Sequence, residues 1–254
     1  MLCPIFSERK DKLKIMISAN IKNISLFDTT SWKDKIFLTF DVDWASDEVL
    51  SFVLDIIEKQ DVKATFFFTH ETILLDRMKN NSNIELGIHP NFNPLLNGDV
   101  RYGKDIDEVI DSFMKIVPDA VSVRSHSMTQ NTLILDSFTK HGLKYDCNHF
   151  IPVSAGIELE PWFLWNKQLI KVPYYWEDDV HCMYDWEWNV KPYLNQEGLK
   201  VFDFHPIHVF LNTEHLDRYE KFKESQKHDN LSYHVNTQHY GTYTFLMDLI
   251  KVGI

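Results

Sequence analysis

The chain has 254 residues, of which 44% are hydrophobic and 25% charged, which is typical of a folded globular protein with a full core. Its net charge of −11 repels phosphate backbones and anionic lipid, and no stretch reaches the roughly 18 apolar residues of a membrane span, so we expect no nucleic-acid binding and no stable membrane insertion. Three widely spaced cysteines (Cys3, Cys147 and Cys182) argue against a disulfide scaffold or zinc knuckle and, with no recognisable signal peptide, favour a cytoplasmic protein.

The chain begins with a polar, irregular segment, residues 1–34, which we expect to form an N-terminal lead-in over the main body. Strands then alternate with helices. Apolar runs predict seven strands, at residues 36–40, 63–68, 84–88, 120–124, 143–145, 169–174 and 200–204. Hydrophobic periodicity and capping residues predict helices at residues 47–60, 71–80, 105–116, 129–141, 214–226 and 243–252.

Strands separated by helices indicate parallel βαβ units, and no linker divides the chain. We therefore predict that residues 35–254 form a single α/β domain, a distorted seven-stranded (β/α) barrel. Such a barrel places its active groups at the carboxyl ends of the strands. An open doubly wound sheet is the alternative, but no glycine-rich phosphate loop supports it.

Polar side chains follow several of these strands. Asp41 and Asp43 lie two residues apart, so in an extended segment they project to the same side. Two adjacent carboxylates repel each other unless a cation or an arginine shares the site. The alternative is a helix cap beside a surface salt bridge.

One arginine and several imidazole groups end other strands. Arg124 offers a fork that binds a carboxylate in bidentate fashion, and His205 could donate a proton. His89 is a candidate metal ligand. The third protein ligand could be Asn93, four residues later, or His126, although an amide oxygen binds a zinc-like metal less well than imidazole does. Taken singly, each of these residues is as well explained by a loop or rim contact.

In their shared order, these segments resemble the motifs of the polysaccharide deacetylase superfamily, carbohydrate esterase family 4. Residues 39–43 are similar to the family's first motif, in the variant with one residue between the acids. Residues 64–68 resemble its second strand, and Arg124 stands where the motif arginine belongs. Residues 172–179 are similar to a paired-acid segment of intracellular-type members, and residues 204–206 to the last, histidine-bearing motif. The resemblance covers about residues 36–206, and the nearest subgroup is the one named for WbmS, which is tied to surface-polysaccharide gene clusters.

The resemblance implies a role for each matching residue: Asp41 as general base, Asp43 and His89 as metal ligands, Arg124 as the residue that orients Asp41, and His205 as general acid. The sequence departs from the family twice. Asn93 stands where a second histidine is usual, and His126 stands where a proline is usual. These changes are compensatory if His126 supplies the missing imidazole. The expected cofactor is a divalent metal, Zn²⁺ first, with Co²⁺, Ni²⁺ or Mn²⁺ as alternatives.

Two further expectations concern the surroundings of this site. Asp178 or Asp179 could hold the second nitrogen of His205. Trp176 lies next to this acid pair and is the aromatic residue we expect to contact a sugar, with Asn91 and Tyr174 as further substrate-binding candidates. A buried aromatic patch is the competing interpretation.

The sequence thus predicts a metal-dependent hydrolase that removes an N-acyl group, expected to be N-acetyl, from an amino sugar in bacterial surface polysaccharide (O-antigen or capsule) biosynthesis. The substrate partner would be a small-molecule or carrier-linked amino sugar. One alternative is a metal-independent amidohydrolase on the same fold, which would stay active after chelation. The other is a catalytically inactive carbohydrate-binding homologue.

Overall fold

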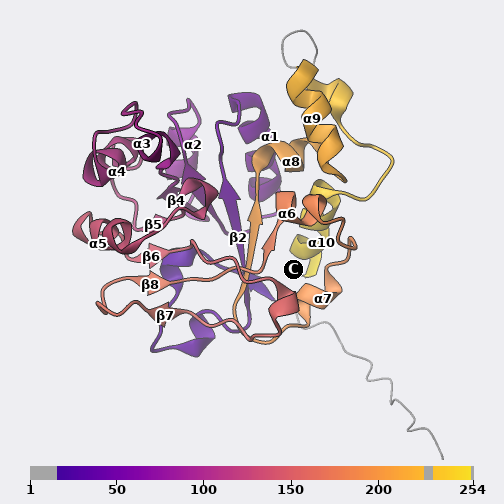
Figure 1. The fold of residues 1–254 in the computed structure, drawn as a ribbon. Helices are drawn as coiled ribbons and strands as arrows, with labels where there is room; N and C mark the ends of the chain where they lie inside the picture. Colours follow the sequence, from indigo (N-terminus) through magenta and orange to yellow (C-terminus); the bar gives the residue numbers. More distant parts are fainter. Residues whose placement is uncertain (1–15, 226–230, 253–254) are drawn as a thin grey trace, which may run out of the picture.

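The seven predicted strands form one parallel sheet in the computed structural model, which describes residues 16–225 and 231–252 (Figure 1). These strands are β2 (Lys35–Asp41), β3 (Ala64–Phe68), β4 (Ile84–Ile88), β5 (Ser122–Val123), β6 (Tyr145–Asp146), β8 (Ile170–Lys171) and β10 (Lys200–Phe204). Three short strands that were not predicted extend the sheet: β1 (Ile17–Ser18), β7 (Trp162–Phe163) and β9 (Trp176–Glu177). Only the pairing of β7 with β8 is antiparallel among the described pairs.

One extended segment joins the two ends of the sheet. The strand order is β7-β8-β6-β5-β4-β3-β2-β10-β9. Strands β8 and β9 stand near opposite ends of this order, yet only residues 172–175 separate them in the chain. Because β8 pairs with β6 and β9 pairs with β10, the segment bridges the gap and the sheet curls round on itself. The prediction of a single α/β domain built as a distorted seven-stranded (β/α) barrel is confirmed.

Helices surround the sheet (Figure 1). Six match predicted helices, most with shorter bounds: α1 (Asp47–Lys59), α2 (Leu75–Lys79), α4 (Ile106–Met114), α5 (Thr132–Lys140), α9 (Leu216–Ser225) and α10 (Thr242–Val252). Residue 226, the predicted end of α9, lies outside the described residues. Four helices were not predicted, because four to six residues are too few to show a periodicity: α3 (Asn93–Leu96), α6 (Asp178–Met183), α7 (Lys191–Leu194) and α8 (Pro206–Leu211). Short 3-10 turns complete the described elements: η1 (Ile21–Asn23), η2 (Thr29–Ser31), η3 (His126–Met128), η4 (Val153–Ala155) and η5 (Leu231–His234).

Phenylalanine rings fill the centre of the sheet. Phe40 of β2 stacks on Phe66 of β3 with ring centroids 4.6 Å apart, and Phe204 of β10 lies 5.6 Å from Phe40 on the other side. All three rings are fully buried. A parallel sheet that is covered on both faces has strands that are apolar throughout, which is why these strands were visible as unbroken apolar runs.

The described part of the lead-in, residues 16–34, closes the amino end of the barrel. The backbone N–H of Ile21 donates to Thr65 Oγ1 at 3.2 Å, and that of Lys22 donates to Glu85 Oε2 at 2.9 Å. Trp32, in the same segment, is buried. Residues 1–15 lie outside the described residues. With the amino end covered, the carboxyl ends of the strands remain for a functional site.

In the described part of the chain, no helix has both the length and the apolarity that crossing a bilayer requires.

Candidate active site

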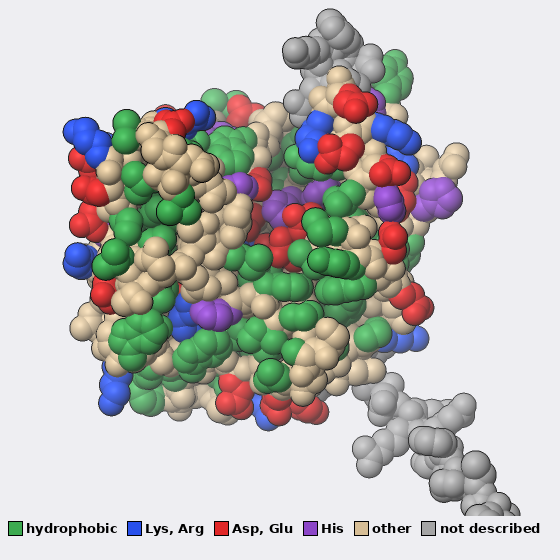
Figure 2. Space-filling view, in the orientation of Figure 1, with side chains coloured by type: hydrophobic (Ala, Val, Ile, Leu, Met, Phe, Trp, Pro, Cys, Tyr) green, Lys and Arg blue, Asp and Glu red, His purple; other side chains and the backbone are tan. Residues whose placement is uncertain are grey.

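The polar residues at the carboxyl ends of the strands converge on one hollow. Asp41 ends β2, His89 follows β4, Arg124 follows β5 and His205 follows β10. Figure 2 shows histidine and acidic side chains gathered in the hollow at the middle of the face that it presents. Parallel strands all deliver their last residues to the same edge of the sheet, so residues far apart in sequence meet there.

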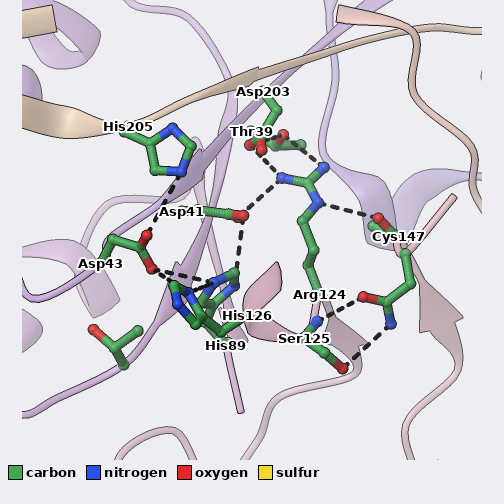
Figure 3. A network of polar contacts seen from close by, with 12 residues as sticks. Thr39, Asp41, Asp43, His89, Arg124, Ser125, His126, Cys147, Asp203 and His205 are labelled. Carbon is green, nitrogen blue, oxygen red and sulfur yellow. Dashed lines mark hydrogen bonds and ion pairs between the residues drawn. The ribbon is translucent and has the colours of Figure 1, made fainter. Parts of the chain in front are cut away.

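Three donor atoms form a compact triangle in this hollow (Figure 3). Oδ1 of Asp43 lies 3.1 Å from Nδ1 of His126 and 3.2 Å from Nε2 of His89, and the two nitrogens are 3.4 Å apart. A tetrahedral zinc ion with bonds of about 2.0–2.2 Å holds its ligand atoms about 3.4 Å apart. The triangle therefore fits a divalent cation in both its dimensions and its donors, one carboxylate and two imidazoles.

A turn after β2, and not an extended strand, brings the two carboxylates to the same ring. The strand ends at Asp41, and Asp43 has a left-handed backbone with φ 41°. The predicted extended conformation is therefore wrong at Asp43, although the convergence that it implied is present. Oδ2 of Asp41 faces His89 Nδ1 at 3.5 Å, while Asp43 faces Nε2 of the same ring. Burial alone would raise the pKa of Asp43, but His126 and His89 hold it well below its ordinary value.

Arg124 is buried beside the triangle, where it contacts Asp41 (Figure 3). Its Nη1 donates to Asp41 Oδ1 at 2.9 Å and also to Asp203. Its Nη2 donates to Thr39 Oγ1 at 3.0 Å, and its Nε donates to the carbonyl oxygen of Cys147 at 3.1 Å. The guanidinium is thus hydrogen-bonded at all three nitrogens, which fixes the orientation of Asp41.

Asp203 is a part of this network that sequence reasoning missed. It lies near the carboxyl end of β10, is 1% exposed, and accepts hydrogen bonds from Arg124 and Thr39. Burial raises the pKa of Asp203 well above its ordinary value against the attraction of Arg124, and the negative charge of Asp41 raises it further. An acidic residue inside an apolar strand requires buried hydrogen-bond partners, and that was the signal in the sequence.

His205 is held by a single carboxylate. Its Nδ1 lies 2.7 Å from Oδ1 of Asp178, whose Oδ2 accepts the backbone N–H of His205 at 2.8 Å. Its other nitrogen, Nε2, faces Oδ2 of Asp43 at 3.7 Å. Burial would lower the pKa of His205, but Asp178, with Asp179 and Asp43, raises it well above its ordinary value. The ring therefore favours its protonated form, and its Nε2 faces Asp43 of the triangle.

The two asparagine candidates support the neighbouring loop. The backbone N–H of Asn93 donates to Oδ1 of Asn91 at 3.0 Å, in a turn that leads into α3. The side chain of Asn93 donates to Ser127 Oγ at 3.2 Å and accepts from Thr129 Oγ1 at 3.3 Å. Both atoms of its amide are thus engaged with the loop that carries His126.

Two predicted substrate contacts are core residues instead. Trp176 is fully buried, stacks on Phe245 at 4.4 Å, and donates its indole N–H to His181. Tyr174 is 1% exposed, lies against the guanidinium of Arg124 and donates its hydroxyl to Glu177. Rings with no free face cannot stack on a sugar, so the structure corrects this expectation in favour of the buried aromatic patch.

Trp44 is the aromatic side chain that does stand at the site. It follows Asp43 directly, is 44% exposed, and meets the ring of His126 edge to face at 5.1 Å. A cavity of about 540 Å³ opens beside it and reaches Asp43. Its position directly after Asp43 was the available signal in the sequence.

Comparison with solved structures gives one strong likeness. A Bordetella bronchiseptica protein, described as a candidate polysaccharide deacetylase involved in O-antigen biosynthesis, is 46% identical, with a TM-score of 0.88 over 93% of this chain and 98% of that one. A candidate polysaccharide deacetylase from Mycobacterium smegmatis is 15% identical, with a TM-score of 0.46 over 76% of this chain and 82% of its own. A family 4 carbohydrate esterase from Streptomyces lividans is 14% identical, with a TM-score of 0.40 over 67% and 78%. These two distant likenesses carry no argument. Comparison with curated proteins gives no match.

A family profile settles the classification. The profile of the WbmS-like polysaccharide deacetylases matches residues 38–223, which contain the donor triangle, Arg124 and His205. Both the profile and the Bordetella bronchiseptica structure cover most of the chain. The chain therefore belongs to the WbmS-like polysaccharide deacetylase family.

Proposed function

We propose that this protein is a metal-dependent hydrolase that removes an N-acyl group, expected to be N-acetyl, from an amino sugar during the assembly of a bacterial surface polysaccharide. The observation that carries the proposal is the triangle of Asp43, His89 and His126 donors, with Asp41 next to His89 and His205 next to Asp43. The role in surface polysaccharide assembly rests on the likeness to the Bordetella bronchiseptica protein.

Asp43, His89 and His126 would hold the cation. One carboxylate and two imidazoles suit Zn²⁺ best, with Co²⁺, Ni²⁺ or Mn²⁺ as alternatives. When bound, such an ion polarises an acyl carbonyl and lowers the pKa of a water from 15.7 to about 7. Asn93 is the weaker candidate for the third ligand, because both atoms of its amide already have hydrogen-bond partners.

Asp41 would act as general base and take the proton of the attacking water. Arg124 stabilises its carboxylate through Oδ1, which leaves Oδ2 on the side of the triangle. A base must lie within hydrogen-bond reach of the proton it removes, and Asp41 lies directly against a ligand of the proposed cation.

His205 would act as general acid at Nε2. An amide cleaves only when its nitrogen leaves as a neutral amine, so a proton must reach that nitrogen as the bond breaks. Asp178 accepts from Nδ1 and from the backbone N–H, so it sets both the tautomer and the orientation of the ring. The proposed proton donor therefore faces Asp43 of the triangle, while the proposed base faces His89.

The decisive test is acetate release from N-acetylated amino sugars by protein that has been stripped with a chelator and then reloaded. We expect release to stop on chelation, to return with Zn²⁺ or Co²⁺, and to be lost in Asp41→Asn. Full release after chelation would instead support a metal-independent amidohydrolase. Binding of sugar without any release would support an inactive homologue.

A further inference from the structure

The cavity beside the donor triangle has a chemical character of its own. It measures about 540 Å³, a size typical of ligand pockets, and begins at Asp43. Its walls come from the start of α1, from α8 and α9, and from η5, and include Trp44, Asp47, Glu48, Ile207 and Tyr219. It therefore extends the site away from the reacting centre, with room for a group next to the one that reacts.

Trp44 is held in a backbone conformation that is unusual for its type. Its φ is 57°, and Asp43 before it is also left-handed. Bulky side chains rarely adopt this region, and such strain tends to persist at functional sites. Burial of the ring does not compensate, since 44% of the side chain is exposed. An exposed indole that is kept at the cost of strain, beside a ligand of the proposed cation, indicates a surface for substrate.

The charges of the cavity exclude one kind of occupant. Among its described lining residues none is Lys or Arg, whereas Asp47 and Glu48 are acidic. The N-terminus of α1 opens here, but the Ser46 side chain already accepts from the N–H of Val49, and the two acids stand in the first turn. Phosphate sites use arginine, lysine or free helix N-termini, so a diphosphate is disfavoured in this cavity.

We propose that the cavity beside Trp44 binds an uncharged pyranose that adjoins the acylated sugar, with its apolar C–H face on the indole. The substrate is then an oligosaccharide, and not a sugar whose anomeric diphosphate occupies this cavity. This inference rests on the proposed function, and it adds the substrate class to it.

The test compares the wild type with Trp44→Gly, which removes the ring and also relieves the left-handed strain. Trp165→Ala, at an exposed tryptophan in the turn between β7 and β8, is the matched control. The probes are N,N′-diacetylchitobiose, N-acetylglucosamine and UDP-N-acetylglucosamine. For the disaccharide we expect Trp44→Gly to raise KM at least tenfold with a smaller change in kcat, and Trp165→Ala to match the wild type.

Binding measured by calorimetry on metal-free protein gives a second readout that does not need turnover. The wild type should bind the disaccharide at least tenfold more tightly than either the monosaccharide or Trp44→Gly does. Equal affinity in Trp44→Gly, no binding of the disaccharide by the wild type, or a preference for the UDP-sugar would each overturn the inference. If the wild type binds the disaccharide through Trp44 but releases no acetate from any probe, the proposed function fails while the cavity assignment stands.

Two controls separate substrate binding from a structural role. The melting temperature of Trp44→Gly should equal or exceed that of the wild type, because strain is relieved and no buried ring is lost. Its affinity for Zn²⁺ should stay within threefold, although the indole touches His126. A large fall in either quantity would show that Trp44 supports the fold or the metal ligand, and it would contradict the inference.

Discussion

Asp178 makes two hydrogen bonds with His205. Its Oδ1 lies 2.7 Å from the ring Nδ1, and its Oδ2 lies 2.8 Å from the backbone nitrogen of the same residue. One carboxylate thus fixes both where the histidine stands and which way its ring faces. Asp178 is fully buried, so this geometry is not exchanged for contacts with water.

Asp178→Asn should therefore impair the proton donor and little else. We expect kcat/KM for an N-acetyl sugar to fall about 100-fold, at the lower end of the contribution that general acid–base catalysis makes. Hydrolysis of an aryl acetate, whose leaving group needs no proton, should fall far less. Asp179→Asn is the matched control, since the carboxylate of Asp179 acts on His205 through its charge and not through a hydrogen bond to the ring. An equal fall in kcat/KM for the amide and the ester would show that His205 does not act as the general acid.

His126→Ala and Asn93→Ala distinguish the two candidates for the third metal ligand. Altering residues that only support ligands costs about 10–100-fold in metal affinity, so losing a ligand should cost at least about 100-fold. We expect that loss for His126→Ala, and only a few-fold change for Asn93→Ala, whose amide bonds Ser127 and Thr129. Calorimetric titration of metal-free protein with Zn²⁺ measures both. An unchanged Zn²⁺ affinity in His126→Ala would show that His126 is not a metal ligand.

Arg124→Lys tests whether the buried network needs the fork of arginine. One ammonium cannot reach Asp41, Asp203 and the carbonyl of Cys147 together, and an unmade bond to a buried charged group is costly. We expect the free energy of unfolding in urea to fall by about 2 kcal/mol or more.

Arg77→Lys is the control for that variant. Arg77 also pairs with two carboxylates, those of Asp55 and Glu58, but its side chain is 32% exposed. Exposed pairs contribute about 0–1 kcal/mol, so this variant should unfold close to the wild type. Similar urea midpoints for both variants would mean that the Arg124 network adds little to stability.

The fold was predictable because its strands are buried on both faces. β4 and β10 have the predicted bounds, since their apolar runs end sharply at polar residues. β9 was missed because it is two residues long and follows β8 after a short break, so sequence alone shows one run. Tertiary contacts decide that β8 pairs with β6 whereas β9 pairs with β10.

The site was only partly predictable, because sequence shows where polar residues end strands but not which rings stay exposed. Trp44 and Trp176 both lie next to acidic residues in sequence, yet one is 44% exposed and the other is fully buried. The difference arises from the packing of Phe245 in α10 on Trp176, a contact between residues far apart in the chain. Asp203 was missed for the same reason, since its partner Arg124 follows a different strand, β5.

His181 should make the stability of the protein depend on pH. It is buried, and its Nδ1 accepts the indole N–H of Trp176 at 2.9 Å, so the ring must be neutral. Burial lowers the pKa of His181 to about 4, despite the nearby charge of Asp178. In the unfolded chain the pKa returns to about 6.5.

Below pH 6.5 His181 therefore binds a proton in the unfolded state, whereas in the folded state it stays neutral until about pH 4. The stabilising contribution is complete above pH 6.5 and is lost as the pH falls toward 4. Each pH unit of this window is worth about 1.4 kcal/mol, so the whole loss is about 3 kcal/mol. His181→Asn keeps an acceptor for the indole but does not titrate. When the pH is lowered from 7 to 4.5, the free energy of unfolding in urea should fall by about 2.5 kcal/mol more for the wild type than for this variant. Parallel pH profiles would show that His181 is protonated as easily in the folded chain as in the unfolded one.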